Sequence, residues 1–304
     1  MPLRHIEDFC SFVRGKDKIV AVALGEDHHI LEALERGSSQ DLFNVINFAR
    51  RDRVNDISDK YNIDTSRFKI IEASSEEDAV ALAVKAVRDG KADVLVKGSC
   101  SSAEYLRGIL NKTSGLVPEG NLLSHAIVLD IPKYHKLLIA SDVAVIPFPT
   151  LDEKICEIKY CVAIANQLGV PIPRVSIVAA CEKASSLTKA MVDGAILSKM
   201  NERGQIRDCI IDGPLSLGCS ISKDSRVTER VGYTITGDAD ILIFPDIETG
   251  NTVVKTLKHL CNTISCGVLA GTIAPCVLTS RGDSTETKLY SIVFGVLLSL
   301  QEAL

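Results

Sequence analysis

The sequence lacks the signals of several large classes of protein. Its N-terminus has no apolar core of the kind found in signal peptides, and no apolar run reaches the roughly 18 residues that a membrane-spanning helix requires. None of the ten cysteines forms a C-x-x-C pair or stands near histidines at the spacing of zinc ligands. Neither G-x-x-x-x-G-K-[ST] nor a G-x-G-x-x-G after a strand pattern is present. Nucleoside triphosphate sites and a Rossmann-type NAD site therefore lack support.

The charges also lack a pattern that would attract a polyanion. The net charge is −5, and the basic residues are scattered along the chain instead of forming a stripe. Most cysteines stand beside Val, Ile or Ala, as small core residues do. We therefore expect a cytoplasmic protein with free, mostly buried thiols, which binds neither nucleic acid nor a membrane.

Strand and helix patterns alternate along nearly all of the 304 residues. Strand patterns cover residues 18–24, 69–73, 92–96, 126–129, 137–139, 143–146, 175–180, 210–212 and 241–244, with 126–129 and 137–139 forming a candidate hairpin. Helix patterns cover residues 28–34, 76–88, 151–168, 187–199, 250–260 and 285–304. Regular alternation of this kind predicts an α/β protein with mainly parallel sheets covered by helices.

The segment from Pro275 to Ser284 carries the most chemistry. A short apolar run is followed by Ser280, Arg281 and Asp283, and a long helix pattern begins directly afterwards. A hydroxyl, a guanidinium and a carboxylate thus stand at a strand-to-helix junction, where backbone N–H groups and the helix dipole favour an anion such as phosphate. Capping is the structural alternative, with Asp283 or Ser284 as N-cap and Glu286 or Thr287 reaching back.

Other strand ends carry weaker candidates. Lys97 and Gly98 end a strand pattern ahead of a helix that bears Arg107, a place where α/β proteins bind ligands, although a plain turn also fits. Asp212 and Gly213 end another strand, where the carboxylate could orient a substrate or bond loop amides. The acidic residues on both sides of 241–244 fit no calcium loop and are better explained as turns and caps, so we expect no metal. The histidines His125 and His135 have no Ser or Cys partner that would indicate a triad.

Taken together, these motifs resemble those of the phosphate acetyl/butyryl transferase family. The resemblance runs from about Lys91 to the C-terminus and is carried by Lys97-Gly98, Tyr105-Leu106-Arg107, Leu110-Asn111-Lys112, Leu122-Leu123-Ser124-His125, Ile131-Pro132-Lys133-Tyr134, Leu197-Ser198-Lys199-Met200, Glu202-Arg203-Gly204-Gln205-Ile206, Asp212-Gly213-Pro214-Leu215, Gly237-Asp238-Ala239-Asp240-Ile241-Leu242, Glu248-Thr249-Gly250-Asn251 and Leu278-Thr279-Ser280-Arg281. The stretch Asp283-Ser284 with Thr287-Lys288-Leu289 is most similar to the phosphate butyryltransferase branch.

The resemblance implies a fold and an activity. Family members transfer an acyl group reversibly between coenzyme A and inorganic phosphate, with coenzyme A as a substrate and no metal or other cofactor. Their fold has two α/β lobes around a cleft, is related to isocitrate and isopropylmalate dehydrogenases, and is usually dimeric. By this resemblance we expect a homodimer whose first lobe contains residues 1–124 and 267–304 and whose second lobe contains residues 125–266. The expected ligands are acyl-CoA or CoA, phosphate and acyl phosphate, with a short, butyryl-type acyl group favoured.

The resemblance also suggests roles for individual residues. By hypothesis Asp283 takes the proton of the coenzyme A thiol, while Arg281 and Ser280 stabilise charge on the phosphate or the tetrahedral oxygen. Arg107 is expected to hold phosphate groups of the substrate or coenzyme A. The remaining residues carried over as substrate-binding are Lys97, Gly98, Ser124, Asp212, Gly213, Gly250 and Asn251.

Two departures from the family pattern keep alternatives open. The acetyltransferases place their presumed base seven positions after the serine, where this chain has Thr287, so Asp283 is an inference and Glu286 the reserve candidate. Gly218 stands where members typically have an aspartate. A catalytically impaired homologue that senses coenzyme A or acyl phosphate is therefore one alternative. A metal-dependent 2-hydroxy acid dehydrogenase of related fold is the other.

Overall fold

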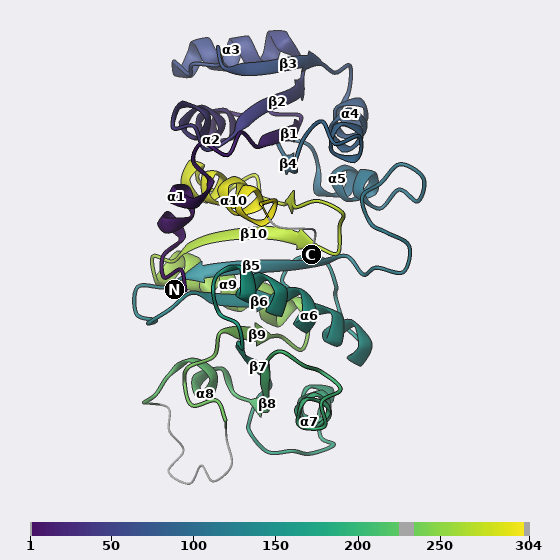
Figure 1. Ribbon diagram of the computed structural model, residues 1–304, viewed down its shortest axis with the longest axis vertical. Helices are drawn as coiled ribbons and strands as arrows, with labels where there is room; N and C mark the ends of the chain where they lie inside the picture. Colours follow the sequence, from purple (N-terminus) through teal and green to yellow (C-terminus); the bar gives the residue numbers. More distant parts are fainter. Residues whose placement is uncertain (1, 225–233, 301–304) are drawn as a thin grey trace. The chain divides into compact units, whose positions relative to one another are not determined.

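In the computed structural model, which describes residues 2–224 and 234–300, the chain forms two compact units whose elements are labelled in Figure 1. The first unit comprises Glu7–Leu123 and Ser265–Leu304, and the second comprises Met1–Ile6 and Ser124–Ile264. A short 3₁₀ helix, η1 (Ile6–Asp8), lies where the chain enters the first unit.

The first unit is a parallel sheet with helices between its strands. Its strands are β1 (Ile19–Ala23), β2 (Asn44–Ala49), β3 (Phe68–Glu72), β4 (Val94–Lys97), β10 (Ile264–Ala270) and β11 (Cys276–Val277). Its helices are α1 (Phe9–Val13), α2 (His28–Ser39), α3 (Arg51–Tyr61), α4 (Glu76–Arg88), α5 (Ser102–Ile109) and α10 (Thr285–Leu298). The strands follow the order β3-β2-β1-β4-β11-β10, and all neighbours pair in parallel except β10 with β11.

This order has a functional consequence. From β1 the chain moves outward through β2 to β3 and then returns to place β4 on the other side of β1. Such a reversal opens a crevice at the carboxyl ends of the two central strands, where doubly wound sheets bind ligands. Lys97 is the last residue of β4, so it lies at this switch point.

Local sequence signals explain how the helices of the first unit begin and pack. Ser75 caps α4 by accepting a hydrogen bond from the backbone N–H of Asp78, so the helix begins at residue 76 as predicted. Helix α10 is buried almost all round, packs against α1 and α2, and stacks Phe294 on Phe9 with ring centroids 5.7 Å apart. An apolar helix of this kind belongs in a core and not on a surface.

The second unit is a smaller α/β unit. Its strands are β5 (Ser124–Asp130), β6 (Leu138–Ser141), β7 (Arg174–Val178), β8 (Ile210–Leu215) and β9 (Ile241–Ile243). Its helices are α6 (Leu151–Gln167), α7 (Lys189–Glu202), α8 (Leu217–Ile221) and α9 (Ile247–Leu260). The strand order is β5-β6-β9-β7-β8, with β5 and β6 antiparallel and the other pairs parallel. The predicted hairpin and the mostly parallel α/β class are thereby confirmed.

Several sequence predictions were wrong in detail. Residues 143–146 form bends and not a strand, because the Asp142 carboxylate accepts hydrogen bonds from the backbone N–H groups of Ala144 and Val145. Helix α9 begins at Ile247 and not at Gly250, because Asp246 caps it through the N–H of Thr249. The helix pattern from residue 285 ends at Leu298, and its last four residues lie outside the described part. The predictions did not include β2, α3 or β10.

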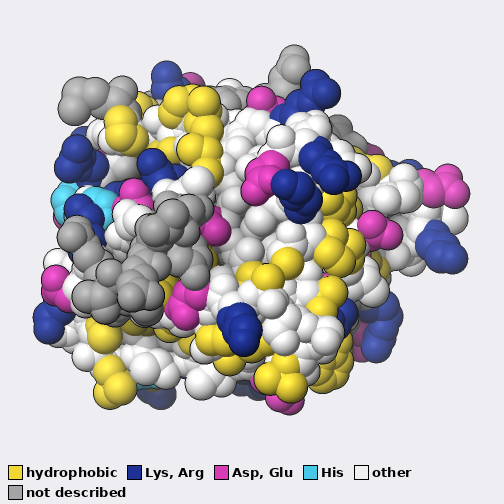
Figure 2. All heavy atoms as spheres, turned by 90° about the horizontal axis from the view of Figure 1, so that it is seen from below, with side chains coloured by type: hydrophobic (Ala, Val, Ile, Leu, Met, Phe, Trp, Pro, Cys, Tyr) yellow, Lys and Arg dark blue, Asp and Glu magenta, His cyan; other side chains and the backbone are white. Residues whose placement is uncertain are grey.

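The face shown in Figure 2 carries charges of both signs, and the described helices are of ordinary length. On the face in Figure 2, Lys and Arg side chains are interspersed with Asp and Glu side chains. No helix within residues 2–224 and 234–300 is both long and apolar enough to span a bilayer. All ten cysteines are free thiols, and six of them are buried.

Candidate functional site

In the first unit the carboxyl ends of β4 and β11 bring two predicted segments together. The strands pair in parallel, with Leu95 opposite Cys276 and Val96 opposite Val277. Because parallel neighbours end at the same edge, Lys97 leaves the sheet beside the turn that leads to Ser280. The sequence placed these residues 183 positions apart, and the sheet makes them neighbours.

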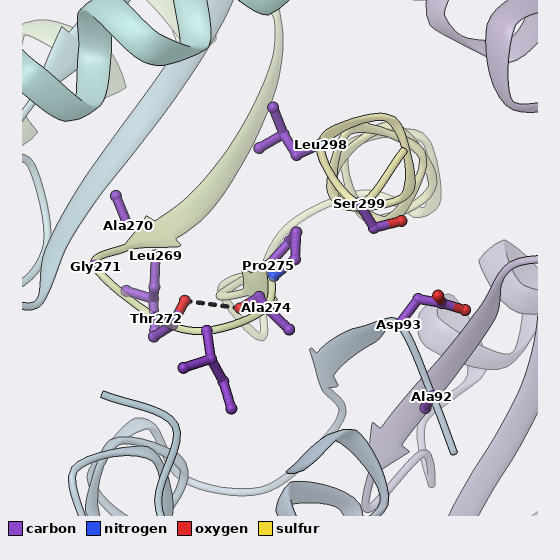
Figure 3. Close-up of a pocket in the computed structure, with 11 residues that line it drawn as sticks. Ala92, Asp93, Leu269, Ala270, Gly271, Thr272, Ala274, Pro275, Leu298 and Ser299 are labelled. Carbon is purple, nitrogen blue, oxygen red and sulfur yellow. Dashed lines mark hydrogen bonds between the residues drawn. The ribbon is translucent and has the colours of Figure 1, made fainter. Parts of the chain in front are cut away.

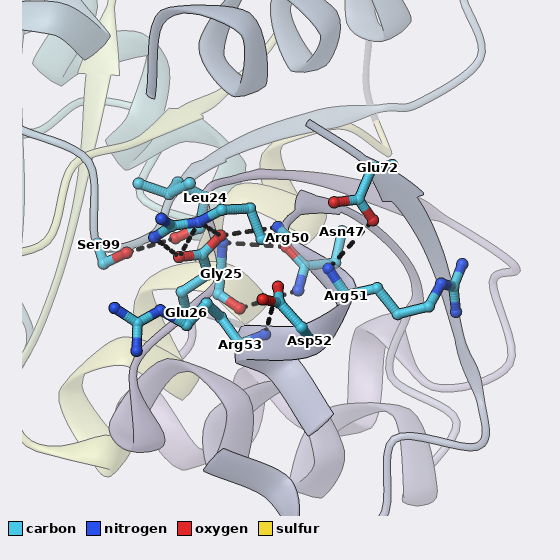
Figure 4. A network of polar contacts seen from close by, with 10 residues as sticks. All are labelled: Leu24, Gly25, Glu26, Asn47, Arg50, Arg51, Asp52, Arg53, Glu72 and Ser99. Atoms are coloured by element: carbon cyan, nitrogen blue, oxygen red, sulfur yellow. Dashed lines mark hydrogen bonds and ion pairs between the residues drawn. The ribbon is translucent and has the colours of Figure 1, made fainter. Parts of the chain in front are cut away.

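Hydrogen bonds between side chains and backbone groups hold the ends of β1 and β4 together, as Figure 4 shows. The Asn47 side chain accepts a hydrogen bond from Gly25 N at 3.0 Å and donates one to Gly25 O at 2.9 Å. The Ser99 hydroxyl donates to Leu24 O at 2.8 Å. A Cβ on Gly98 would lie 2.2 Å from Leu24 O, so only glycine fits where β1 and β4 end. This explains Gly98 by close backbone approach, without a ligand.

Lys97 is buried, with 2% of its surface exposed, although the sequence predicted it as a substrate-binding residue. Its Nζ lies 3.4 Å from Gly98 O and 3.5 Å from Thr279 O. Burial lowers the pKa of the Lys97 ammonium, and the cations Lys288 and Arg281 lower it further. Among the described residues it forms no ion pair, and its hydrogen bonds are to these two backbone carbonyls; the charge of Asp27 acts on it in the opposite direction, raising its pKa.

Ser280 and Arg281 are exposed on the turn after β11. The Asp283 carboxylate accepts a hydrogen bond from Ser280 N at 2.8 Å and so closes this turn. The N-cap of α10 is Ser284, whose Oγ accepts from Thr287 N at 3.2 Å. Of the two capping residues considered from the sequence, Ser284 therefore caps the helix, and Asp283 holds the turn.

Two residues beside this turn were not identified from the sequence. Lys288 is 1% exposed and donates from Nζ to Ser280 O at 3.1 Å. Thr279 is 4% exposed, and its Oγ1 has no hydrogen-bond partner among the described residues. A lysine on the buried face of an apolar helix was the available signal for Lys288, because charged residues are rarely buried without a reason.

Arg107 lies on α5, the helix that follows β4. Its side chain is 71% exposed and forms an ion pair with Glu104 one turn earlier. Ser101 caps the helix and donates its own N–H to Glu76 at 2.7 Å. Hydrogen bonding from Ser101 lowers the pKa of the Glu76 carboxyl, as do the charges of Arg281 and Lys97. Glu76 thus lies within the field of the same cations.

In the second unit three predicted residues gather around Asp142, which is buried. Its carboxylate accepts hydrogen bonds from the Ser124 hydroxyl and from His125 N, both at 2.9 Å. Asn251 donates to the carbonyl of the next residue, Val143, at 3.0 Å. A Cβ on Gly250 would lie 2.5 Å from Asp142 O. Ser124 thus bonds the Asp142 carboxylate, while Gly250 and Asn251 contact the backbone carbonyls of Asp142 and Val143; sequence reasoning did not single out Asp142.

Asp212 and Gly213 lie elsewhere in the second unit, on β8. The Asp212 carboxylate accepts hydrogen bonds from Thr234 N at 2.7 Å and Ile235 N at 3.1 Å. Gly213 packs against Ile177 of β7 and accepts a hydrogen bond from the Ser198 hydroxyl. Of the two roles considered for Asp212, the structure displays the bonding of loop amides.

Each of the two units contains a cavity lined by described residues. A pocket of about 210 Å³ in the first unit is lined by residues around Asp93 and Pro275, which precede β4 and β11, so it lies at the amino ends of these strands (Figure 3). Its hydrogen bond from Thr272 Oγ1 to Ala274 O closes the loop that leads into β11. A pocket of about 550 Å³ in the second unit lies where β7 and β9 end. Within residues 2–224 and 234–300, no three His, Cys, Asp or Glu side chains are grouped to hold a metal.

Known proteins resemble the chain over nearly its full length. The family described as "Phosphate acetyl/butaryl transferase" matches residues 73–296. The phosphate butyryltransferase of Clostridium acetobutylicum is 38% identical over 298 residues, covering 98% of this chain and 99% of its own. That of Clostridium beijerinckii is 37% identical over 282 residues, covering 93% of each chain.

A solved structure also matches. The branched-chain phosphotransacylase from Enterococcus faecalis V583 superimposes with a TM-score of 0.82 at 26% identity, covering 94% of this chain and 99% of its own. The sequence motifs, the 37–38% identity over nearly the full length and the fold all indicate the same family. The chain belongs to the phosphate acetyl/butyryl transferase family and is an acyltransferase.

Proposed function

We propose that the protein transfers a short-chain acyl group, with butyryl favoured, reversibly between coenzyme A and inorganic phosphate. The observation that carries the proposal is the turn at Ser280. It presents a hydroxyl and a guanidinium at the switch-point edge, above two buried ammonium groups that have no carboxylate partner among the described residues. The Arg281 guanidinium and these two ammonium groups can attract a phosphate or acyl phosphate to this edge.

The proposed chemistry uses side chains alone, with coenzyme A as substrate and no metal or other cofactor. In the direction of acyl-CoA synthesis, the coenzyme A sulfur attacks the acyl phosphate carbonyl and loses its proton to Asp283. A carbon–sulfur bond forms, the carbon–oxygen bond to phosphate breaks, and the phosphate leaves with that electron pair. Arg281 neutralises charge on the phosphate, and the Ser280 hydroxyl donates a hydrogen bond to it or to the tetrahedral oxygen.

The geometry of Asp283 is compatible with this role. Its Oδ2 accepts the Ser280 N–H at 2.8 Å, and an ionised carboxylate has further lone pairs that can accept a proton. The same bond would hold Ser280 and the base in one turn. Glu286 remains the reserve candidate for the base.

The other substrate-binding residues are proposals with different support. Exposed Arg107 could exchange its ion pair with Glu104 for a phosphate group. Lys97 and Gly98 would shape the edge from within. Ser124, Gly250 and Asn251 share the surroundings of Asp142, whereas Asp212 and Gly213 are engaged in loop and strand packing.

We also propose the organisation of the molecule that the family resemblance implies. The lobes would be residues 1–124 with 267–304 and residues 125–266, in a fold related to isocitrate and isopropylmalate dehydrogenases. The protein would act in the cytoplasm as a homodimer. The two compact units and their mostly parallel strands support the lobes, with the difference that Met1–Ile6 groups with the second unit.

The activity is tested by following free thiol released from butyryl-CoA or acetyl-CoA in the presence of phosphate. The blank omits phosphate, because the ten cysteines of the protein also react with thiol reagents. Ser280→Ala and Arg281→Ala should each lower kcat by at least about 10²-fold if both stabilise the transition state. Near-normal rates in both variants would refute these roles. If no thiol is released from any short acyl-CoA although the protein still binds coenzyme A, the result would favour the alternative suggested by Gly218, a catalytically impaired homologue that senses coenzyme A or acyl phosphate.

A further inference from the structure

The backbone of Ser280 is held on both sides. Its N–H donates to the Asp283 carboxylate at 2.8 Å. Its carbonyl accepts from Lys288 Nζ at 3.1 Å and from Asp283 N at 3.2 Å. Both backbone groups of Ser280 are therefore engaged within the protein, while Ser280 and Arg281 are themselves exposed.

Lys288 makes its contact from inside the protein. It is 1% exposed and stands in the first turns of α10, on the helix face that also buries Leu289 and Ile292. Among the described residues it pairs with no carboxylate, and its hydrogen bond is to Ser280 O. An ammonium buried in this way opposes folding, since desolvation is not offset by an opposite charge. A packing role alone would be better filled by methionine or leucine.

Lys288 extends from the start of α10, where the helix is hydrogen-bonded to α2. Ser284 caps the helix, and the next residue, Thr285, donates its hydroxyl to Glu32 at 2.8 Å and contacts His29 Nδ1 at 3.1 Å. These bonds tie the helix to α2, so the ammonium extends from an anchored helix to the turn. The comparable contact of Lys97 with Thr279 O is longer, at 3.5 Å.

We propose that Lys288 is a positioning residue for the acyl-transfer step, which holds the Ser280 carbonyl so that the Ser280 hydroxyl meets the reacting oxygen. The inference rests on the proposed function, because it assigns Lys288 a role through Ser280. A donor that is already oriented stabilises a transition state more than a mobile one, so the loss of Lys288 affects kcat more than binding.

A double-mutant cycle tests this role. Wild type, Lys288→Met, Ser280→Ala and the double variant are compared by thiol release from butyryl-CoA with phosphate. Lys288→Met should lower kcat by about tenfold or more while the KM for acyl-CoA stays within about twofold. In the Ser280→Ala background the same change should cost less than about threefold, because the group it positions is already absent. Lys288→Arg, which keeps a charged donor, should recover part of the rate.

The matched control is Lys85→Met, which removes an exposed lysine of α4 in the same unit and should leave kcat unchanged. Thermal melting of every variant separates misfolding from lost positioning, and Lys288→Gln replaces Lys288→Met in the cycle if the latter does not fold. A wild-type kcat in Lys288→Met, or losses that add fully in the double variant, would overturn the inference and leave the proposed function intact. An inactive wild type would instead refute the proposed function, and the role of Lys288 with it.

Discussion

The buried lysines of the two units have different kinds of hydrogen-bond partner. In the second unit, Lys154 is 1% exposed and lies 2.8 Å from the Asp193 carboxylate, which also accepts Lys189 at 2.6 Å. In the first unit, Lys97 and Lys288 are equally buried, yet within the described residues both are bonded to backbone carbonyls. The second unit pairs its buried Lys154 with a carboxylate, whereas the first unit bonds its two buried lysines to backbone carbonyls.

The difference suggests different roles for the buried lysines of the two units. A compensated pair inside a protein holds elements together, here α6 and α7, and offers little to a ligand. Uncompensated cations beneath an exposed turn oppose folding but raise the affinity of that turn for an anion.

The largest effect of a substitution at neutral pH should come from breaking the ion pair between Lys154 and Asp193. Lys154→Met leaves the buried Asp193 with only the more exposed Lys189, and we expect a loss of about 3 kcal/mol in the free energy of unfolding. Urea unfolding measures it. Lys199→Met, which removes an exposed pair with Glu202 on the same helix, is the control and should lose less than about 1 kcal/mol. Equal losses in both variants would contradict the structural role of the buried pair.

A second test concerns Glu157 on α6, which is fully buried, with neither carboxyl oxygen bonded among the described residues. Burial, with a contribution from Asp142, raises the pKa of this carboxyl from 4.5 to about 8. Between these values the native state keeps a proton that the unfolded chain releases. Stability should therefore fall by about 1.4 kcal/mol for each pH unit as the pH rises through this window.

Glu157→Gln does not titrate, so its unfolding free energy should lack this decline. Denaturant unfolding of both proteins between pH 5 and pH 8 measures the difference. Parallel curves for the variant and the wild type would show that Glu157 ionises normally in the folded protein.

Lys97→Met is the counterpart of Lys154→Met in the first unit. Because the Lys97 ammonium is buried with no carboxylate partner among the described residues, its replacement by an apolar side chain should leave the free energy of unfolding unchanged or raise it. The kcat/KM for phosphate should nevertheless fall by about tenfold, since positive charge is lost at the proposed anion site. A large loss of stability with unchanged kinetics would reverse the comparison.

The smallest effect should be the same in both units. Ser284→Ala removes the cap of α10, and Thr188→Ala removes the cap of α7. Each should lower the free energy of unfolding by about 1 kcal/mol, because each deletes one side-chain acceptor for a terminal N–H. If Asp283 and not Ser284 capped α10, Ser284→Ala would have no effect in thermal or urea unfolding.

Local patterns could be read correctly because they depend on neighbours in the sequence. The helix over residues 76–88 and the hairpin of β5 and β6 were both predicted. The strand assigned to residues 143–146 was wrong, because β-branched residues suggested a strand while the Asp142 side chain holds the backbone in bends. Side-chain bonds of this kind leave no trace in an apolar pattern.

The family, the α/β class and the segment that carries Ser280 and Arg281 were determined by the sequence alone, since motifs and periodicity are local properties. Only the tertiary structure decided which charges have a partner. Lys154 and Lys288 are both lysines on buried helix faces, but packing places one against Asp193 and the other against the carbonyl of Ser280. Burial and compensation depend on elements distant in the sequence, and these set the energy of a buried charge.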